Sequence, residues 1–314
     1  MHSHVIPSPL NHLSPLMARF LQESPPLPVL SEKSIGEMRA QFRERYRKLN
    51  DKAPTHDLAI SQSSVPTSQG PQQARLYIPR MHGPCPVLLF FHGGGFVFGD
   101  LDSLEIFCGE ISDFADCIVL SVDYPLAPEH PFPAAPKACY EATVWTNKHV
   151  AEWGGEGLFL IGSSAGATLA AAVTLMIRAR GGPQIRGQIL LNPMMDANFA
   201  TQSYVEYATG TNITREQCIW FLSRYCPDSS QYTNPLLCPL QATYFDDLPR
   251  AMLVTAECDP LRDEGRAYAK KLQEANGACE DLCYPGMIHG FATLPIDSPE
   301  KRDVIRKIKD FIHK

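Results

Sequence analysis

One serine between two glycines constrains the fold of this 314-residue chain more than any other feature of its sequence. The motif of Gly162, Ser164 and Gly166 follows an apolar run at 158–161 and precedes an alanine-rich stretch. This order predicts a strand, a sharp turn and a helix. Side chains at the two glycine positions would collide inside such a turn. The motif therefore predicts that the Ser164 hydroxyl projects beyond the end of a sheet, although an ordinary turn of small residues also produces this pattern.

Two histidines follow this serine and are candidates for a general base. When a sheet presents a nucleophile in this way, its partners come in the chain order serine, acid, histidine. Of the ten histidines, only His289 and His313 come after Ser164. We expect His313 to lie at the frayed end of a helix. His289 lies in a loop rich in glycine and proline at 284–291, after an alternating apolar segment, which favours it as the base.

The acid is chosen by its position relative to a strand. Asp259 comes just after an apolar run that is typical of a buried parallel strand. Ligand-facing groups of open α/β sheets lie beyond the carboxyl ends of the strands. Glu257 is the second choice, because we expect the end of the strand to point it into the packing. Asp263 and Glu264 are typical of the acidic first turn of a helix. Asp259 is therefore expected to orient His289.

A glycine-rich loop follows another predicted central strand, at 86–91. His92 is followed by Gly93, Gly94 and Gly95, whose backbone N–H groups no side chain shields. Such groups can stabilise a developing oxyanion, and the N–H of Ala165 would add a further donor. Glycine-rich loops also bind phosphates, but no Lys-Ser/Thr pair follows this one. We expect His92 to hold the loop through hydrogen bonds rather than to bind a metal.

Several segments taken together resemble a known family. They lie at 92–96, 123–129, 162–166, 257–265 and 287–291. In order and spacing they are similar to the hormone-sensitive-lipase-like carboxylesterases, a branch of the α/β-hydrolase superfamily. The resemblance implies a serine carboxylesterase that hydrolyses esters of short to medium acyl chains through an acyl-enzyme, with no cofactor and no metal.

The resemblance also implies roles for individual residues. It implies a catalytic triad of Ser164, Asp259 and His289. The implied oxyanion hole consists of the N–H groups of Gly94, Gly95 and Ala165, with Gly93 in support. Two positions depart from the family pattern. Ser163 stands where the family usually has an acidic residue or threonine, and Pro125 where it often has arginine. These departures bear on the shape of the pocket rather than on proton transfer.

Strands and helices are predicted to alternate along the chain, which is typical of a mostly parallel sheet. With 44% apolar residues, a chain of this length can form one α/β domain. We expect an α/β-hydrolase fold: an eight-stranded, mostly parallel sheet flanked by helices, with a helical cap. The strands are predicted near 57–61, 73–78, 86–91, 117–122, 158–162, 185–191, 251–256 and 280–284. The main helices are predicted near 102–115, 134–149, 165–180, 263–275 and 299–313.

Two segments fall outside this alternation and are expected to form the cap, at about 1–50 and 197–240. The catalytic core is then about 51–196 and 241–314. In the first segment, apolar residues recur at helical spacing from Ile35 to Leu49, and Ser34 with Glu37 predicts a capping box. The second is rich in aromatic residues around 219–225, most of which we expect to pack against one another.

Charge and hydropathy limit the partners. A net charge of −6 argues against a nucleic-acid surface. No apolar run approaches the ~20 residues that span a bilayer, and no signal-peptide pattern is present. Ten cysteines in mostly apolar surroundings are typical of buried thiols, so we expect a cytoplasmic protein and give the sequon at Asn212 no weight. The expected partner is a small-molecule ester, and a homodimer is compatible with the family.

Two other functions remain open at this stage. An amidase or deacetylase would use the same serine, acid and histidine, because a fold does not fix its substrate. A ligand-binding protein on an inactive hydrolase frame is the second, as in the plant gibberellin receptors that resemble this family. Those receptors lack the triad histidine, whereas this chain has His289.

Overall fold

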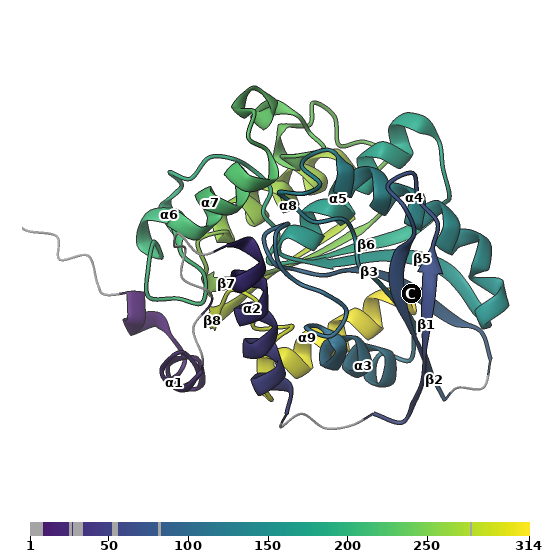
Figure 1. Ribbon diagram of the computed structural model, residues 1–314, viewed down its shortest axis with the longest axis horizontal. Coiled ribbons are helices and arrows are strands. Elements are labelled where there is room, and N and C mark those ends of the chain that lie inside the picture. The colour runs from purple at the N-terminus through teal and green to yellow at the C-terminus, as the bar shows by residue number, and fades with distance from the viewer. Residues whose placement is uncertain (1–8, 25–26, 28–33, 52–55, 81–82, 277) are drawn as a thin grey trace, which may run out of the picture.

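The fold is centred on one sheet of eight strands, as predicted (Figure 1). The computed structural model describes residues 9–24, 27, 34–51, 56–80, 83–276 and 278–314. The strand order is β1-β2-β4-β3-β5-β6-β7-β8. The strands are β1 (Leu58–Val65), β2 (Gln72–Pro79), β3 (Cys85–Phe91), β4 (Ile118–Val122), β5 (Gly155–Ser163), β6 (Ile185–Leu191), β7 (Ala251–Cys258) and β8 (Cys279–Ile288). Only β2 pairs antiparallel, with β1 and β4, and the remaining pairs are parallel.

Helices cover both faces of this sheet (Figure 1). On one face lie α3 (Glu105–Phe114) and α9 (Pro299–Ile312), which contact each other. On the other face lie α4 (Ala134–His149), α5 (Ala165–Arg180) and α8 (Arg262–Asn276). Each face has its own apolar cluster, and all residues of β3 and β4 are buried between the two. Such runs of buried apolar residues are typical of parallel strands covered on both faces.

Shorter elements complete the described chain. Helices α1 (Pro15–Glu23) and α2 (Ile35–Asn50) precede the sheet, and α6 (Gln202–Glu206) and α7 (Arg215–Tyr225) lie between β6 and β7. Four 3₁₀ turns are η1 (Pro9–His12), η2 (Ala151–Trp153), η3 (Ser229–Thr233) and η4 (Pro239–Gln241). The predicted capping box of Ser34 and Glu37 is present at the start of α2. No helix in the described part of the chain is long and apolar enough to cross a bilayer.

Several predicted boundaries were wrong, among them those of β1, α3 and β8. Strand β1 continues to Val65, because its polar residues pair with β2 at the exposed edge of the sheet. Helix α3 begins at Glu105 rather than at 102, since residues 101–104 form a turn. Strand β8 extends to Ile288, through residues that we expected to lie in a loop. The register shifts within β8, so that Cys258 of β7 pairs with Ile288.

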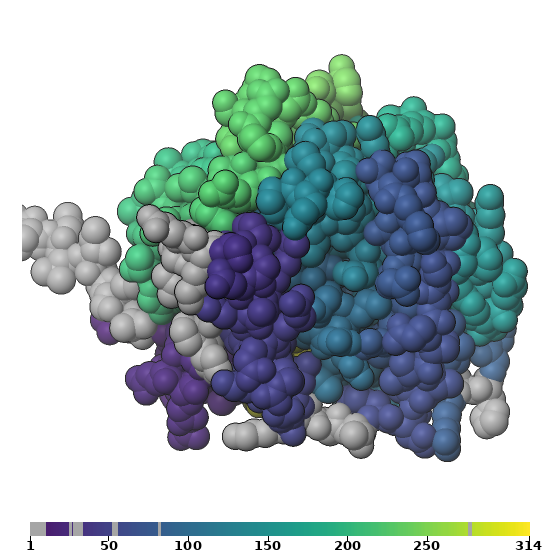
Figure 2. All heavy atoms as spheres, viewed as in Figure 1, coloured from purple at the N-terminus to yellow at the C-terminus, as the bar shows by residue number. Residues whose placement is uncertain are grey.

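Two segments distant in sequence meet over the glycine-rich loop. From α2, Arg39 Nε donates to the carbonyl of Val97 at 2.8 Å, and the ring of Phe42 lies 5.6 Å from that of Phe98. From α7, the ring of Phe221 lies 5.3 Å from the same Phe98 ring. Figure 2 shows α2 forming part of the outer surface on this side of the molecule. The ends of the central strands are therefore covered by side chains from α2 and α7.

Candidate active site

The predicted turn after β5 is present and leaves no room for larger residues. A Cβ atom on Gly162 would lie 2.2 Å from the carbonyl oxygen of Gly166, and one on Gly166 would lie 2.0 Å from that of Phe91. Ser164 itself has φ 54° and ψ −121°, a strained conformation for a residue with a side chain. The Ser164 N–H donates to the carbonyl of Leu191 in β6 at 2.8 Å. Sheet and helix together hold the serine in this conformation.

The structure brings Ser164, His289 and Asp259 together in one hydrogen-bonded chain. Ser164 Oγ lies 3.0 Å from His289 Nε2, and His289 Nδ1 lies 2.8 Å from Asp259 Oδ2. All three are buried, with exposed fractions of 9%, 6% and 0%. The pairing of Cys258 with Ile288 explains how two of them meet, because it places residues 259 and 289 side by side where β7 and β8 end. Asp259 Oδ1 also accepts a bond from the Leu261 N–H at 2.9 Å.

The carboxylates that we rejected as the acid have other partners. Glu257 is not packed away as expected: its carboxylate is one-third exposed and accepts from the Gly286 N–H at 2.8 Å. Glu264 accepts from the N–H groups of Met195 and Asp196. The second histidine candidate, His313, lies 2.9 Å from the carbonyl of Ala115 through Nε2.

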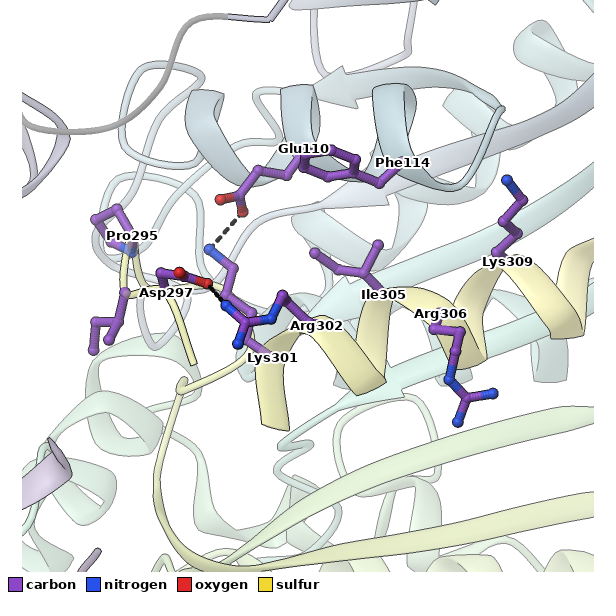
Figure 3. A pocket seen from close by; sticks show the side chains of 10 residues that line it. Glu110, Phe114, Pro295, Asp297, Lys301, Arg302, Ile305, Arg306 and Lys309 are labelled. Carbon is purple, nitrogen blue, oxygen red and sulfur yellow. Dashed lines mark hydrogen bonds and ion pairs between the residues drawn. The ribbon is translucent and has the colours of Figure 1, made fainter. Parts of the chain in front are cut away.

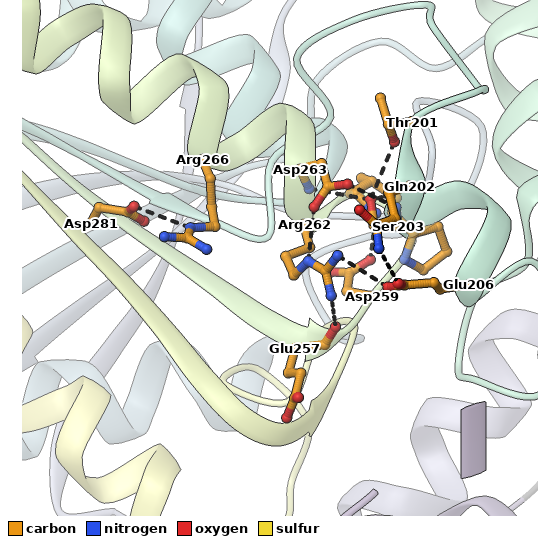
Figure 4. Close-up of polar contacts among 12 residues, drawn as sticks. Thr201, Gln202, Ser203, Glu206, Glu257, Asp259, Arg262, Asp263, Arg266 and Asp281 are labelled. Carbon is orange, nitrogen blue, oxygen red and sulfur yellow. Dashed lines mark hydrogen bonds and ion pairs between the residues drawn. The ribbon is translucent and has the colours of Figure 1, made fainter. Parts of the chain in front are cut away.

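Polar contacts anchor α6 beside Asp259 (Figure 4). The Ser203 N–H donates to Asp263 at 2.8 Å, and its hydroxyl donates to the carbonyl of Pro260 at 2.6 Å. At the other end of this short helix, the carboxylate of Glu206 accepts a bond from Arg262 Nη2 at 3.2 Å. The first turn of α8 therefore holds α6 in place immediately after the buried acid.

The glycine-rich loop lies against the serine turn. A Cβ on Gly93 would lie 3.1 Å from the carbonyl oxygen of Ser163. Gly94 has φ 122°, and a Cβ there would lie 2.1 Å from the carbonyl oxygen of Phe98, so that only glycine fits. Opposite this loop, Ala165 is the first residue of α5, whose N–H has no acceptor within the helix. The dipole of α5 adds partial positive charge at this end.

The buried side chain of His92 contacts the backbone of this loop. Its Nδ1 lies 2.8 Å from the carbonyl of Gly93, and its ring stacks on Tyr124 at 4.3 Å between centroids. The Tyr124 hydroxyl donates to the His92 carbonyl at 2.8 Å. Burial raises the pKa of Tyr124 well above its usual value, which keeps this hydroxyl a donor. His92 thus has the loop-holding contacts that we expected. Within the described residues, no group of three or more His, Cys, Asp or Glu side chains could hold a metal ion.

Sequence reasoning missed two asparagines that contact the same site. Asn192 Nδ2 donates to Asp259 Oδ2 at 2.9 Å. Asn212 Nδ2 donates to the carbonyl of His289 at 3.0 Å. Asn192 directly follows the apolar run of β6, so the strand-end argument that selected Asp259 could have found it. Asn212 carries no comparable signal, because its role depends on how α2 and the segment before α7 meet.

A small cavity of about 50 Å³ opens beside Ser164. Its polar side is formed by the glycine-rich loop, the serine turn and the segment that contains His289. Its apolar lining consists of Leu27, Phe42, Tyr46, Leu104, Ile213 and Phe221. A larger groove of about 660 Å³ runs along α9 and α3, with the paired side chains of Lys301 and Glu110 in it (Figure 3). None of the three hydrogen-bonded residues lines that groove, so the smaller cavity is the one beside the reactive groups.

An eight-stranded, mostly parallel sheet with a serine on a glycine-flanked turn defines an α/β hydrolase. A family model described as alpha/beta hydrolase fold matches residues 88–293. This chain belongs to that family, in its hormone-sensitive-lipase-like carboxylesterase branch.

Several relatives of this chain are named as esterases or ester hydrolases. Carboxylic ester hydrolase LipN of Mycobacterium tuberculosis is 39% identical over 77% of this chain, which is 66% of its own length. Ethyl acetate hydrolase of Pseudomonas putida is 31% identical over 82% of this chain and 83% of its own. The solved structure of a hyperthermophilic esterase from Pyrobaculum calidifontis has a TM-score of 0.87, with 33% identity over 96% of this chain and 97% of its own. The predicted fold, family and class of activity, hydrolysis of carboxylic esters by a serine hydrolase, are confirmed.

Proposed function

We propose that Ser164, His289 and Asp259 are the catalytic triad of this carboxylesterase. The observation that carries this proposal is the continuous chain of contacts, 3.0 Å and 2.8 Å long, from the serine hydroxyl to a fully buried carboxylate. We further propose that the N–H groups of Gly94, Gly95 and Ala165 form the oxyanion hole and that Gly93 supports it. The close fit of the glycine loop against the serine turn supports this part.

In the proposed mechanism, the Ser164 hydroxyl attacks the ester carbonyl carbon. His289 Nε2 takes the hydroxyl proton, and Asp259 holds the imidazole in place and stabilises its charge. The carbonyl oxygen becomes an oxyanion beside the N–H groups of Gly94, Gly95 and Ala165. His289 then gives its proton to the leaving alcohol, which produces an acyl-enzyme. Water repeats the sequence and releases the acid, so the chain's own groups suffice and no cofactor is needed.

A cap over the site is part of the same proposal. It consists of about residues 1–50 and 197–240, and the catalytic core of about 51–196 and 241–314. Contacts of α2 and α7 with the glycine-rich loop support this division. Residues 1–8, 25–26 and 28–33 of the first cap segment lie outside the described residues. Such a cover would shape the pocket and exclude water from it.

The preferred acyl group follows from the small cavity. Within the short to medium range, we propose acetyl to butyryl esters as the best substrates, because about 50 Å³ holds only a few carbon atoms beside Ser164. The enzyme is also proposed to be cytoplasmic, which the eight buried free cysteines among the described residues support. A homodimer stays a prediction that size-exclusion chromatography with light scattering would test.

The decisive experiment compares wild-type enzyme with Ser164→Ala on p-nitrophenyl butyrate. We expect the variant to lose activity by a factor of about 10⁵ or more, with only residual catalysis left. Ser61→Ala, on the exposed edge strand β1, is the matched control and should keep full activity. Full turnover by Ser164→Ala would reject the assignment. Matched ester and amide substrates, measured side by side, test the amidase alternative, which requires the amide to be the faster of the two.

A further inference from the structure

One peptide group beside the proposed base is held from two sides. The carbonyl of His289 accepts a bond from Asn212 Nδ2 at 3.0 Å, and the N–H of Gly290 donates to Asn192 Oδ1 at 3.3 Å. This carbonyl and this N–H belong to the same peptide group. Gly290 has φ 79°, and glycine restrains its own backbone less than any other residue does. The two asparagine side chains restrain this peptide group, while the next carbonyl, that of Gly290, accepts from the N–H groups of Thr293 and Leu294 in the following turn.

Asn192 provides the contact from the sheet. It is 1% exposed, and its N–H donates to the carbonyl of Val254 in β7 at 2.7 Å. Its side-chain N–H group donates to Asp259 Oδ2, the same oxygen that lies 2.8 Å from His289 Nδ1. Asn192 therefore contacts both the acid and the segment that carries the histidine, and fixes one relative to the other.

Asn212 provides the contact from the cap. While its Nδ2 donates to His289, its Oδ1 accepts from Arg45 Nη2 at 2.8 Å. Arg45 belongs to α2 and is only 3% exposed. Its guanidinium lies 6.0 Å from the ring centroid of Phe20 in α1 and 5.6 Å from that of Tyr46. A buried guanidinium is costly unless its partners are well placed, so the geometry of this contact is tightly defined.

We propose that Asn192 and Asn212 form a clamp on the His289–Gly290 peptide group, and that Arg45 couples this clamp to the cap. The two asparagines are positioning residues: they keep the imidazole aligned with Ser164 and Asp259. Docking of α2 then sets the rate of the chemical step as well as the shape of the pocket. This inference rests on the proposed role of His289 as the base.

Asn212→Asp tests the clamp most sharply. The new carboxylate keeps an oxygen for Arg45 but loses the N–H that binds the His289 carbonyl. A 1 Å misplacement of a reacting group costs about a hundredfold in rate. Because Asn192 still holds the other side of the peptide group, we expect a smaller displacement of His289 and a fall of about tenfold in kcat for p-nitrophenyl butyrate. KM and the melting temperature should stay near the wild-type values. Asn198→Asp adds the same charge at an exposed position of the same cap segment and is the matched control.

All rates are normalised to active sites titrated with a fluorophosphonate, so that unfolded protein does not count. An unchanged kcat in Asn212→Asp would overturn the clamp. So would a fall in kcat that disappears after normalisation, because the residue would then act only on stability. Failure of the wild-type enzyme to react with the fluorophosphonate at Ser164 would instead contradict the proposed triad, which keeps the two failures distinct.

The coupling to Arg45 is tested by a double-mutant cycle. Arg45→Met alone should lower kcat several-fold, because Asn212 loses the partner that orients it. In an Asn212→Ala background the same substitution should have no further effect on kcat. Two effects that simply multiply would show that Arg45 does not act through Asn212.

Discussion

The two sides of the active site differ in the atoms that fix their geometry. On the sheet side, backbone atoms fix the geometry: neither Gly162 nor Gly166 has room for a Cβ atom, and Asp259 lies where β7 ends. On the helical side, side chains fix the geometry; the ring of Phe221, for example, packs against Gly95. A backbone arrangement that tolerates little change therefore holds the serine and the acid, whereas exchangeable side chains shape the pocket, apart from the Asn212–Arg45 contact that we propose to align His289.

Burial differs between the two sides in the same sense. In α5, which begins directly after the serine, the first twelve residues are all buried. In the proposed cap, Val205 is 60% exposed and Ile219 is 42% exposed. Segments with fewer buried contacts open more readily than the core does. The cap is therefore the side on which we expect substitutions to change substrate preference without loss of the fold.

The largest effect is expected on the sheet side, from Asp259→Asn. The variant keeps the size of the side chain but removes the charge that orients and stabilises the imidazole of His289. We expect kcat for p-nitrophenyl butyrate to fall by about 10⁴. Asp246→Asn, at an exposed position, should keep wild-type activity. A fall of less than tenfold in Asp259→Asn would show that another acid serves the histidine.

Gly94→Ala should cost about a hundredfold in kcat, the effect of losing one oxyanion donor. Its Cβ would lie 2.1 Å from the carbonyl oxygen of Phe98, so the loop must shift and its N–H groups with it. Gly70→Ala is the control, because Gly70 also has a positive φ, of 93°, but has nothing within 4 Å of the added Cβ. Equal activities of the two variants would contradict the proposed oxyanion hole.

On the cap side, Phe221→Ala should change preference rather than abolish turnover. Removing the ring enlarges the cavity beside Ser164, so kcat/KM for p-nitrophenyl octanoate should rise about tenfold relative to the acetate. Ile219→Ala, its exposed neighbour on α7, should leave the ratio unchanged. A loss of activity on all chain lengths alike would mean that Phe221 supports the fold rather than the pocket.

The smallest expected effect is a loss of folding stability at high pH, to which buried thiols on both sides of the active site should contribute. Burial raises the pKa of Cys139 in the core and of Cys218 in α7 well above the usual 9.0. The folded chain keeps these protons where the unfolded chain loses them. The stabilisation is complete below about pH 9 and is lost above it, by roughly 1.4 kcal/mol per pH unit for each thiol.

Urea unfolding at about pH 8 and about pH 10 measures this loss. Cys139→Ala and Cys218→Ala should each reduce the pH dependence by the same amount if the cap is packed as tightly as the core. A smaller change for Cys218→Ala would show that the cap opens before the rest of the chain unfolds.

The sheet side was largely predictable from the sequence because its determinants are local. A glycine that permits a close approach, or a carboxylate that follows a buried strand, can be recognised from the few residues around it. The extension of β8 to Ile288 was missed, since the register shift opposite Cys258 depends on pairing with β7 and not on the residues of β8 alone.

The contacts of the cap side were not predictable in the same way. Arg45 and Asn212 are 167 positions apart, and neither stands in a recognisable motif. The amphipathic spacing of α2 indicated a helix and its apolar face, but not which polar side chain would be buried with it. Contacts of this kind depend on how two distant segments dock, which a single sequence does not reveal.

Labelling of the nucleophile tests the central claim most directly. Wild-type enzyme is treated with a fluorophosphonate, digested, and its peptides are sequenced by mass spectrometry. We expect one adduct, on Ser164, which forms far more slowly in His289→Gln and is absent in Ser164→Ala. An adduct on any other residue, or ester hydrolysis that continues after Ser164 is fully modified, would contradict the proposed triad.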